Sequence, residues 1–174
     1  MKALPKLIIT DIDGVWTDGS MYYDQKGNEL KRFSTYDSAG VLYAHHLKIP
    51  VVIVTGEETE IVKRRAEKVK IDYLFQGVKN KVEVIDELIQ KLGITFNDCA
   101  FIGDDLNDFH LLKKVGFSGS TANAQDFIKV ISDYTTVRKG GEGAFREFVE
   151  HILKENNLFE NVLAELIDKE QKTS

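Results

Sequence analysis

Short, unbroken apolar runs alternate with longer amphipathic stretches along most of this chain. The clearest runs are Lys6–Thr10, Val51–Val54 and Cys99–Ile102. An uninterrupted apolar strand suits a sheet that is covered on both faces, since both sides of the strand are then buried. Strands that alternate with helices are typical of a parallel sheet. The sequence therefore predicts an α/β fold with a central parallel sheet flanked by helices.

The remaining elements follow from periodicity and turn residues. One segment interrupts the alternation: apolar residues 21–23 and residues 29–33 flank a turn-rich stretch, which predicts a β-hairpin. In the helix over 38–47 we expect Val41, Leu42 and His45 to share one face. Further strands are expected over 73–75, 117–119 and 134–137, further helices over 58–69, 81–92, 107–114, 124–131, 144–153 and 158–168, and frayed residues over 169–174.

Length and composition limit what such a chain can be. With 174 residues we expect a single domain, 1–174, with the hairpin at about 19–34 and a glycine-rich loop and helical tail at about 138–174. A formal charge of -5 argues against a nucleic-acid-coating protein. The lone Cys99 excludes an internal disulfide, and no apolar run is long enough for a membrane span. Without a signal-peptide pattern, a cytosolic protein with no membrane partner is expected.

Polar residues follow three of the predicted strands. Asp11 and Asp13 come after the first, Thr55 after the second, and Asp104 and Asp105 after a later one. The carboxyl ends of parallel strands share one edge of a sheet, where ligands bind. Carboxylates gathered there repel one another unless a cation binds, and hard oxygen ligands suit Mg²⁺.

A second set of observations links this edge to phosphate chemistry. A carboxylate such as Asp11 can attack phosphorus, and an acid two residues later, Asp13, can protonate the leaving oxygen and then activate water. Thr55 and Lys81 can bind phosphate oxygens. Each has a simpler alternative, because Asp pairs are common in turns, Thr55 can cap a helix and most lysines are solvated. Their joint occurrence at element boundaries favours the chemical interpretation.

These residues resemble the four motifs of the haloacid dehalogenase (HAD) superfamily phosphatases. Residues 11–15 look like the first motif, and Thr55, Lys81 and residues 103–105 look like the others, in order. The resemblance implies a Rossmann-like core in which Asp11 is the nucleophile, Asp13 is the general acid/base, and Thr55 and Lys81 hold the phosphoryl group. It also implies Mg²⁺ bound by Asp11, Asp104 and the backbone carbonyl of Asp13, supported by Asp105. Asp108 can support the site by orienting Lys81 or the waters of the metal, or it can simply favour the first turn of a helix.

Segments 11–19, 73–77, 103–108 and 139–147 are similar to a narrower family, the 3-deoxy-D-manno-octulosonate 8-phosphate phosphatases. That resemblance implies a HAD core without a cap domain, a hairpin after the first strand, and a homotetramer in which a neighbouring subunit helps to close each site. The implied substrates are phosphorylated 2-keto-3-deoxy sugar acids.

One residue departs from the octulosonate pattern. After Gly56 that branch commonly has Arg, whereas this chain has Glu57. Glu57 with Lys68 looks more like a related branch that acts on 2-keto-3-deoxy-nonulosonate 9-phosphate, so we favour the nine-carbon acid over the eight-carbon one. A glutamate is also simply favourable at the start of a helix. The substrate-binding residues expected are Thr35, Asp37, Ser38, Gly56, Glu57, Arg65, Lys68 and Asn107.

Several of these residues keep alternatives at this stage. Asp37 or Ser38 can cap the next helix, and the basic residues of 64–68 can form a solvated face. The glycines of 140–143 suit either a plain loop or a mobile flap over a bound sugar, and Arg146 can face an anionic substrate or pair with Glu150. Two rival functions also stay open: a receiver-type signalling domain, and a non-catalytic interaction protein with an inherited fold.

Overall fold

A six-stranded sheet forms the centre of the molecule, whose computed structural model describes residues 3–173. The strand order is β5-β4-β1-β6-β7-β8, and each neighbouring pair is parallel, as the sequence predicted. The strands are β1 (Leu7–Thr10), β4 (Val51–Val54), β5 (Tyr73–Phe75), β6 (Cys99–Gly103), β7 (Phe117–Ser120) and β8 (Tyr134–Thr135).

Strand β1 shows why its sequence is an unbroken apolar run. Its residues alternate between two separate cores, with Ile8 in one and Leu7 and Ile9 in the other. Strand β4 divides in the same way, with Val51 and Val52 on opposite faces. Both faces of the sheet are therefore covered, and no position in these strands is left for a solvated side chain.

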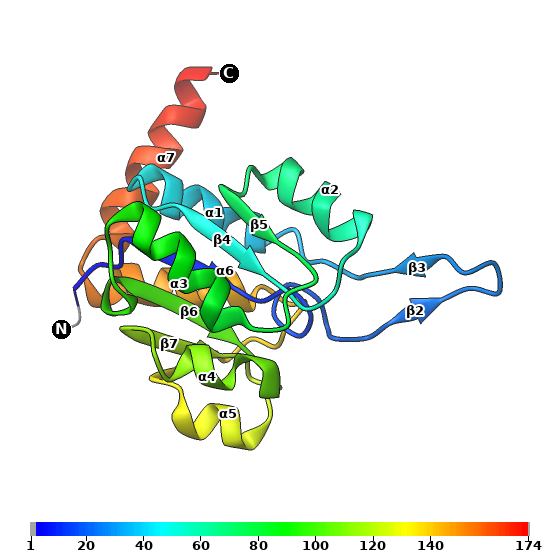
Figure 1. Ribbon diagram of the computed structural model, residues 1–174. Helices are drawn as coiled ribbons and strands as arrows, with labels where there is room; N and C mark the ends of the chain where they lie inside the picture. The colour runs from blue at the N-terminus through cyan, green and yellow to red at the C-terminus, as the bar shows by residue number, and fades with distance from the viewer. Residues whose placement is uncertain (1–2, 174) are drawn as a thin grey trace.

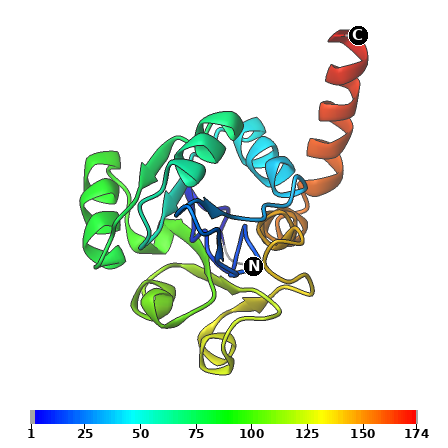
Figure 2. The ribbon, with the colours of Figure 1, turned by 90° about the vertical axis from the view of Figure 1, so that its right-hand side faces the viewer.

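Helices cover each face of the sheet (Figures 1 and 2). Apolar side chains of α1, α2, α6 and α7 pack in one core, and those of α3, α4 and α5 pack in the other. Among the described residues, no helix is both long and apolar enough to cross a membrane. The helices are α1 (Asp37–His46), α2 (Glu60–Val69), α3 (Lys81–Leu92), α4 (Phe109–Leu112), α5 (Asp126–Ile131), α6 (Ala144–Glu155) and α7 (Phe159–Thr173), with short 3-10 turns η1 (Phe96–Asp98) and η2 (Leu106–Asp108).

The predicted hairpin is present and stands away from the sheet (Figure 1). It consists of β2 (Tyr22–Tyr23) and β3 (Glu29–Leu30), which pair antiparallel. A bridge between Thr17 and Phe33 fixes its base. Large apolar side chains are exposed along it, including Tyr23 at 69% and Leu30 at 65%.

Three local predictions were wrong. Leu42 is exposed rather than packed, because Tyr43 and Ala44 turn into the core between α1 and α6 instead. The helix predicted over 107–114 is shorter and begins as the turn η2, since Asp105 and Asp108 form a capping box there. The tail does not fray at 169, because α7 continues to Thr173; Ser174 lies outside the described residues.

Candidate active site

The strand order places the predicted acids side by side. Strand β1 lies between β4 and β6, so Asp11 at its carboxyl end has Thr55 on one side and Asp104 on the other. The chain then turns through Gly14, whose φ of +87° favours glycine. Any side chain at Gly14 would overlap the Asp104 carboxylate. The turn after β1 is thus shaped to let Asp104 approach Asp11.

Three carboxyl groups meet at this edge. Asp11, Asp104 and Asp108 each place an oxygen within 4.8 Å of the others. Burial raises the pKa of Asp11 to about 7, with the charge of Asp108 adding to the shift and that of Lys81 opposing it. Burial and the charge of Asp11 likewise raise the pKa of Asp104 to about 8. Within the described part of the chain, Oδ1 of Asp104 is buried and accepts no hydrogen bond. This donor set fits a hard divalent cation, which would relieve both the repulsion and the unsatisfied oxygen.

Lys81 is the cation already present at this edge. It begins α3, its side chain is almost fully buried, and its Nζ lies 3.0 Å from Asp11 Oδ1 and 2.7 Å from Asp108 Oδ1. Burial alone would lower the pKa of Lys81, but the two carboxylates outweigh it and the net pKa lies above its ordinary value. The ammonium therefore stays charged beside Asp11.

Asp108 is buried and links Lys81 to the backbone that follows β6. Its Oδ1 accepts from Lys81, and its Oδ2 accepts from the backbone N–H groups of Asp104 and Asp105 at 2.9 and 3.3 Å. A side chain at Gly103 would collide with the Asp108 carboxylate, so that glycine is needed for the arrangement. With both oxygens engaged, Asp108 fits a supporting role, and Asp11 and Asp104, which line the cavity over this edge, are the carboxylates that suit an ion.

The carboxylate of Asp13 lies apart from the group formed by Asp11, Asp104 and Asp108. Both of its carboxylate oxygens accept from Lys31 Nζ, at 2.8 and 2.7 Å, and Oδ1 also accepts from the Thr17 hydroxyl at 3.2 Å. Nothing in the sequence marks Lys31 for this contact, because a lysine in a hairpin is ordinarily solvated. The side chain of Asp13 is thus separate from the carboxylate cluster, which leaves only its backbone carbonyl as the predicted metal ligand.

A cavity of about 490 Å³ opens over these groups. Lys81 and Asp108 do not line it, because they are buried at the carboxylate cluster. Gly19, Met21 and Leu106 line it without having been predicted. The predicted site residues that line the cavity are Asp11, Asp13, Thr55, Gly56, Glu57, Asp104, Asp105 and Asn107.

Other predicted substrate-binding residues lie outside this cavity. Asp37 is fully buried, and its Oδ1 accepts from the backbone N–H of Arg146 at 3.1 Å, so it satisfies the first turn of α6. Burial raises the pKa of Asp37 to about 7. Arg65 donates to the Ser34 carbonyl and the Ser38 hydroxyl, both at 3.0 Å, within its own chain. Neither Asp37 nor Ser38 caps α1 with its side chain. Thr35 and Lys68 are exposed.

The glycine-rich loop is packed rather than detached. The N–H of Gly141 donates to the Val15 carbonyl at 3.1 Å, and that of Gly140 donates to Asn123 Oδ1 at 2.8 Å. A side chain at Gly140 would overlap the backbone of Gly14. This loop therefore holds the turn after β1 in place. Arg146 pairs with Glu150 at 2.6 Å, which is the simpler of its two predicted roles.

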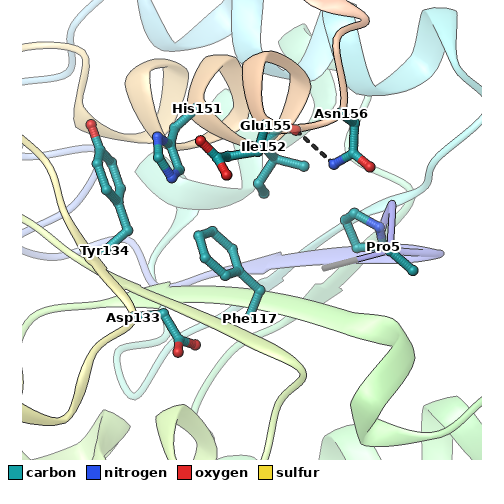
Figure 3. A pocket seen from close by; sticks show the side chains of 9 residues that line it. Pro5, Phe117, Asp133, Tyr134, His151, Ile152, Glu155 and Asn156 are labelled. Atoms are coloured by element: carbon teal, nitrogen blue, oxygen red, sulfur yellow. Dashed lines mark hydrogen bonds between the residues drawn. The ribbon is translucent and has the colours of Figure 1, made fainter. Parts of the chain in front are cut away.

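A second cavity, of about 410 Å³, lies near the start of β7 and β8 (Figure 3). Its wall includes Phe117, Tyr134 and His151, and the last two stack with ring centroids 3.7 Å apart. None of the predicted site residues lines it. The chemistry-bearing groups are thus gathered at the cavity over β1, β4 and β6.

The fold and this edge define a class of protein: a cap-less α/β hydrolase with an aspartate on its central strand. Residues 72–147 match the family model described as haloacid dehalogenase-like hydrolase. The chain belongs to the haloacid dehalogenase-like hydrolases and, within them, to the family of 3-deoxy-D-manno-octulosonate 8-phosphate phosphatases. This membership excludes the receiver-type domain.

Three relatives support that assignment. The 3-deoxy-D-manno-octulosonate 8-phosphate phosphatase of Escherichia coli K12 is 38% identical over 148 residues, which cover 85% of this chain and 79% of that protein. A probable YrbI family phosphatase from Pseudomonas syringae has a TM-score of 0.90 at 36% identity, covering 94% and 93% of the two chains. The Moraxella catarrhalis 3-deoxy-D-manno-octulosonate 8-phosphate phosphatase, in complex with magnesium, phosphate and KDO, has a TM-score of 0.89 at 37% identity and 93% coverage of both chains.

Proposed function

We propose that this protein is a Mg²⁺-dependent phosphatase that removes the terminal phosphate of a 2-keto-3-deoxy sugar acid. One observation carries the proposal: the Asp11 carboxylate is held by Lys81 beside an Asp104 oxygen that lacks a partner among the described residues. A nucleophile, a fixed cation and carboxylate oxygens that suit a divalent ion are thus in one place. The relatives' names supply the substrate class.

The chain's residues then divide the reaction into two steps. An oxygen of Asp11 forms a bond to phosphorus while the bond to the sugar oxygen breaks, and Asp13 gives that oxygen its proton. Asp13 next takes a proton from water, whose oxygen displaces Asp11 from phosphorus. Lys81 and the Thr55 hydroxyl bind the phosphoryl oxygens. Mg²⁺ bound by Asp11, Asp104 and the Asp13 carbonyl would offset the charge on those oxygens.

For the sugar, we favour 2-keto-3-deoxy-nonulosonate 9-phosphate over 3-deoxy-D-manno-octulosonate 8-phosphate. Glu57 lines the cavity, in the position where the octulosonate branch has Arg. A carboxylate accepts hydrogen bonds from sugar hydroxyls but repels a substrate carboxylate, whereas Arg binds one in two-point fashion. The octulosonate ester is the second candidate, and the names of the relatives favour it.

A homotetramer is the assembly we propose. The hairpin exposes Met21, Tyr22, Tyr23 and Leu30, an apolar surface that a second copy would cover. Lys68 is exposed, whereas Arg65 donates to Ser38 of its own chain, so we propose Lys68 as the basic residue of α2 that meets a neighbour's substrate. Closure of the cavity by a neighbour would take the place of a cap domain.

The test compares kcat/KM for the two esters with Mg²⁺ and with EDTA. We expect Mg²⁺-dependent release of phosphate from both and a preference for the nine-carbon ester. Glu57→Arg should reverse the preference, and Glu60→Arg, an equal charge change on an exposed residue outside the cavity, should leave it unchanged. A wild-type preference for the eight-carbon ester would contradict the finer proposal. No hydrolysis of either ester would contradict the function itself and favour the non-catalytic alternative.

A further inference from the structure

A buried ion pair joins the hairpin to the acid/base residue. Lys31, directly after β3, places Nζ 2.8 and 2.7 Å from the two carboxylate oxygens of Asp13. The side chain of Lys31 is 0% exposed, although it stands at the base of a solvated hairpin. Its other acidic neighbour is Glu29, at 3.5 Å. Burial of an ammonium is costly unless close partners compensate it, so this contact is a specific one.

The adjacent residue shows that fixing the hairpin does not require such a contact. Arg32 pairs with Asp18 at 3.4 Å, and its side chain is 57% exposed. This pair also links the hairpin base to the loop after β1, as does the bridge from Thr17 to Phe33. A solvated pair would serve that purpose, yet the chain also buries Lys31, with both carboxylate oxygens of Asp13 as its closest acidic partners.

The contact restricts where the Asp13 carboxylate can lie. Lys31 engages both of its oxygens, and the Thr17 hydroxyl engages Oδ1 from another side. Asp13 nevertheless lines the cavity over Asp11, and its side chain keeps 20% of its surface exposed. Its carboxylate is therefore held at the cavity wall instead of turning freely into solvent.

We propose that Lys31 is a positioning residue that holds the Asp13 carboxylate where it meets the departing sugar oxygen. This inference rests on the proposed function, because it assigns Asp13 the proton transfers. Lys31 itself neither gives nor takes a proton. Through Lys31, the hairpin positions the acid/base residue of its own subunit. A contact that displaces the hairpin would therefore also displace the Asp13 carboxylate.

Two esters with different leaving groups separate this role from a structural one. The sugar oxygen needs a proton when its bond to phosphorus breaks, whereas the phenolate of p-nitrophenyl phosphate leaves without one. The ratio kcat/KM reports only the steps up to and including departure of the leaving group. It is therefore insensitive to the later attack of water on phosphorus. A general acid contributes about 10²–10⁴-fold, so Lys31→Met should lower kcat/KM for the preferred sugar-acid phosphate by about 10–100-fold and that for p-nitrophenyl phosphate by less than about 3-fold. Arg32→Met, which removes the adjacent solvated pair, should lower neither by more than about 2-fold.

Two further variants guard against misfolding and indirect effects. Lys31→Arg keeps the charge with a different geometry and should show a smaller loss with the same selectivity. In an Asp13→Asn background, adding Lys31→Met should cause no further loss of kcat/KM for the sugar ester. An equal loss for both esters, no loss for either, or additive losses in the double variant would overturn the role of Lys31. Wild-type protein that hydrolyses neither ester would instead contradict the proposed function, and the inference with it.

Discussion

The carboxyl edge of the sheet and the hairpin differ in what they bury: the edge buries charged side chains, whereas the hairpin exposes apolar ones. At the edge, Asp11, Lys81 and Asp108 are buried, and Lys81 Nζ lies within 3.0 Å of an oxygen of each carboxylate. In the hairpin, Tyr23 and Leu30 are more than half exposed and have few neighbours of their own chain. The ion pairs of the first region are formed within one chain, because buried charges must be compensated where they are. The second is incomplete, because its apolar surface has no cover. In the proposed function, the catalytic groups are therefore placed within one subunit, and the proposed assembly encloses the substrate.

The largest effect is expected from removing the nucleophile. Asp11→Asn should abolish turnover, because an amide cannot form the bond to phosphorus. Without Mg²⁺ its Tm should be equal to or higher than that of the wild type, since the change removes a buried charge that Asp108 and Asp104 disfavour. Steady-state kinetics and thermal unfolding measure the two outcomes. Undiminished activity would remove Asp11 from its role.

Lys81→Met should damage both activity and stability. It removes the cation from the phosphoryl site, so kcat/KM should fall by about 10²–10³-fold. It also leaves Asp11 and Asp108 without their buried partner, which typically costs about 3–5 kcal/mol. Denaturant unfolding without Mg²⁺ measures that loss. A free energy of unfolding within about 0.5 kcal/mol of the wild type would show that the contacts of Lys81 with Asp11 and Asp108 do not stabilise the fold.

Two glycines with nearly equal φ angles, one at the carboxyl edge and one in the hairpin, allow the two regions to be compared directly. Gly14 and Gly27 have φ of +87° and +83°, but a side chain meets Asp104 at the first and nothing within 4 Å at the second. Gly27→Ala should therefore cost only the strain of its backbone, about 1 kcal/mol. Gly14→Ala should add displacement of Asp104 and weaken Mg²⁺ activation, seen as a raised Mg²⁺ requirement in the activity assay. Equal behaviour of the two variants would contradict the tight fit at the edge.

The raised pKa values of Asp11 and Asp104 make the stability of the fold depend on pH. In the unfolded chain Asp11 and Asp104 ionise near 3.8, but in the folded protein the pKa values lie at about 7 and 8. Between these values the folded state binds more protons, so its stability falls as pH rises. Without Mg²⁺, Tm should drop by a few degrees, roughly 2–4 °C per kcal/mol, from pH 5.5 to 8. Mg²⁺ should cancel the share of the drop that comes from Asp11 and Asp104, whereas buried Asp37, whose pKa is also raised to about 7, should keep its own share. A Tm that rises over this range without Mg²⁺ would contradict the assignment.

The smallest effect on the fold is expected in the hairpin. Tyr23→Lys places a charge on a side chain that is 69% exposed, so the stability of the subunit should change by less than about 0.5 kcal/mol. The proposed tetramer should nevertheless dissociate, which light scattering after size-exclusion chromatography detects. A wild-type protein that is already monomeric at high concentration would show that the apolar surface has another purpose.

The same contrast explains what the sequence could predict. Asp11, Thr55 and Asp104 were found because parallel strands bring their carboxyl ends to one edge, whatever the rest of the chain does. Asp37 was assigned to substrate, but the N–H that its carboxylate meets belongs to Arg146, 109 residues away. Lys31 was missed because its partner is brought to it by the hairpin's placement. Local patterns cannot show contacts that only packing creates.

The central claim is that Asp11 becomes phosphorylated at the carboxyl edge of β1. The most direct test incubates Asp13→Asn protein with Mg²⁺ and p-nitrophenyl phosphate, whose phenolate leaves without a proton, stops the reaction with acid and analyses the peptides by mass spectrometry. Without its base, the second step should stall, and the peptide that contains Asp11 should gain the mass of one phosphoryl group. Asp11→Asn/Asp13→Asn protein should gain none. An adduct on any other residue, or release of phosphate from the ester with no Asp11 adduct, would contradict the account.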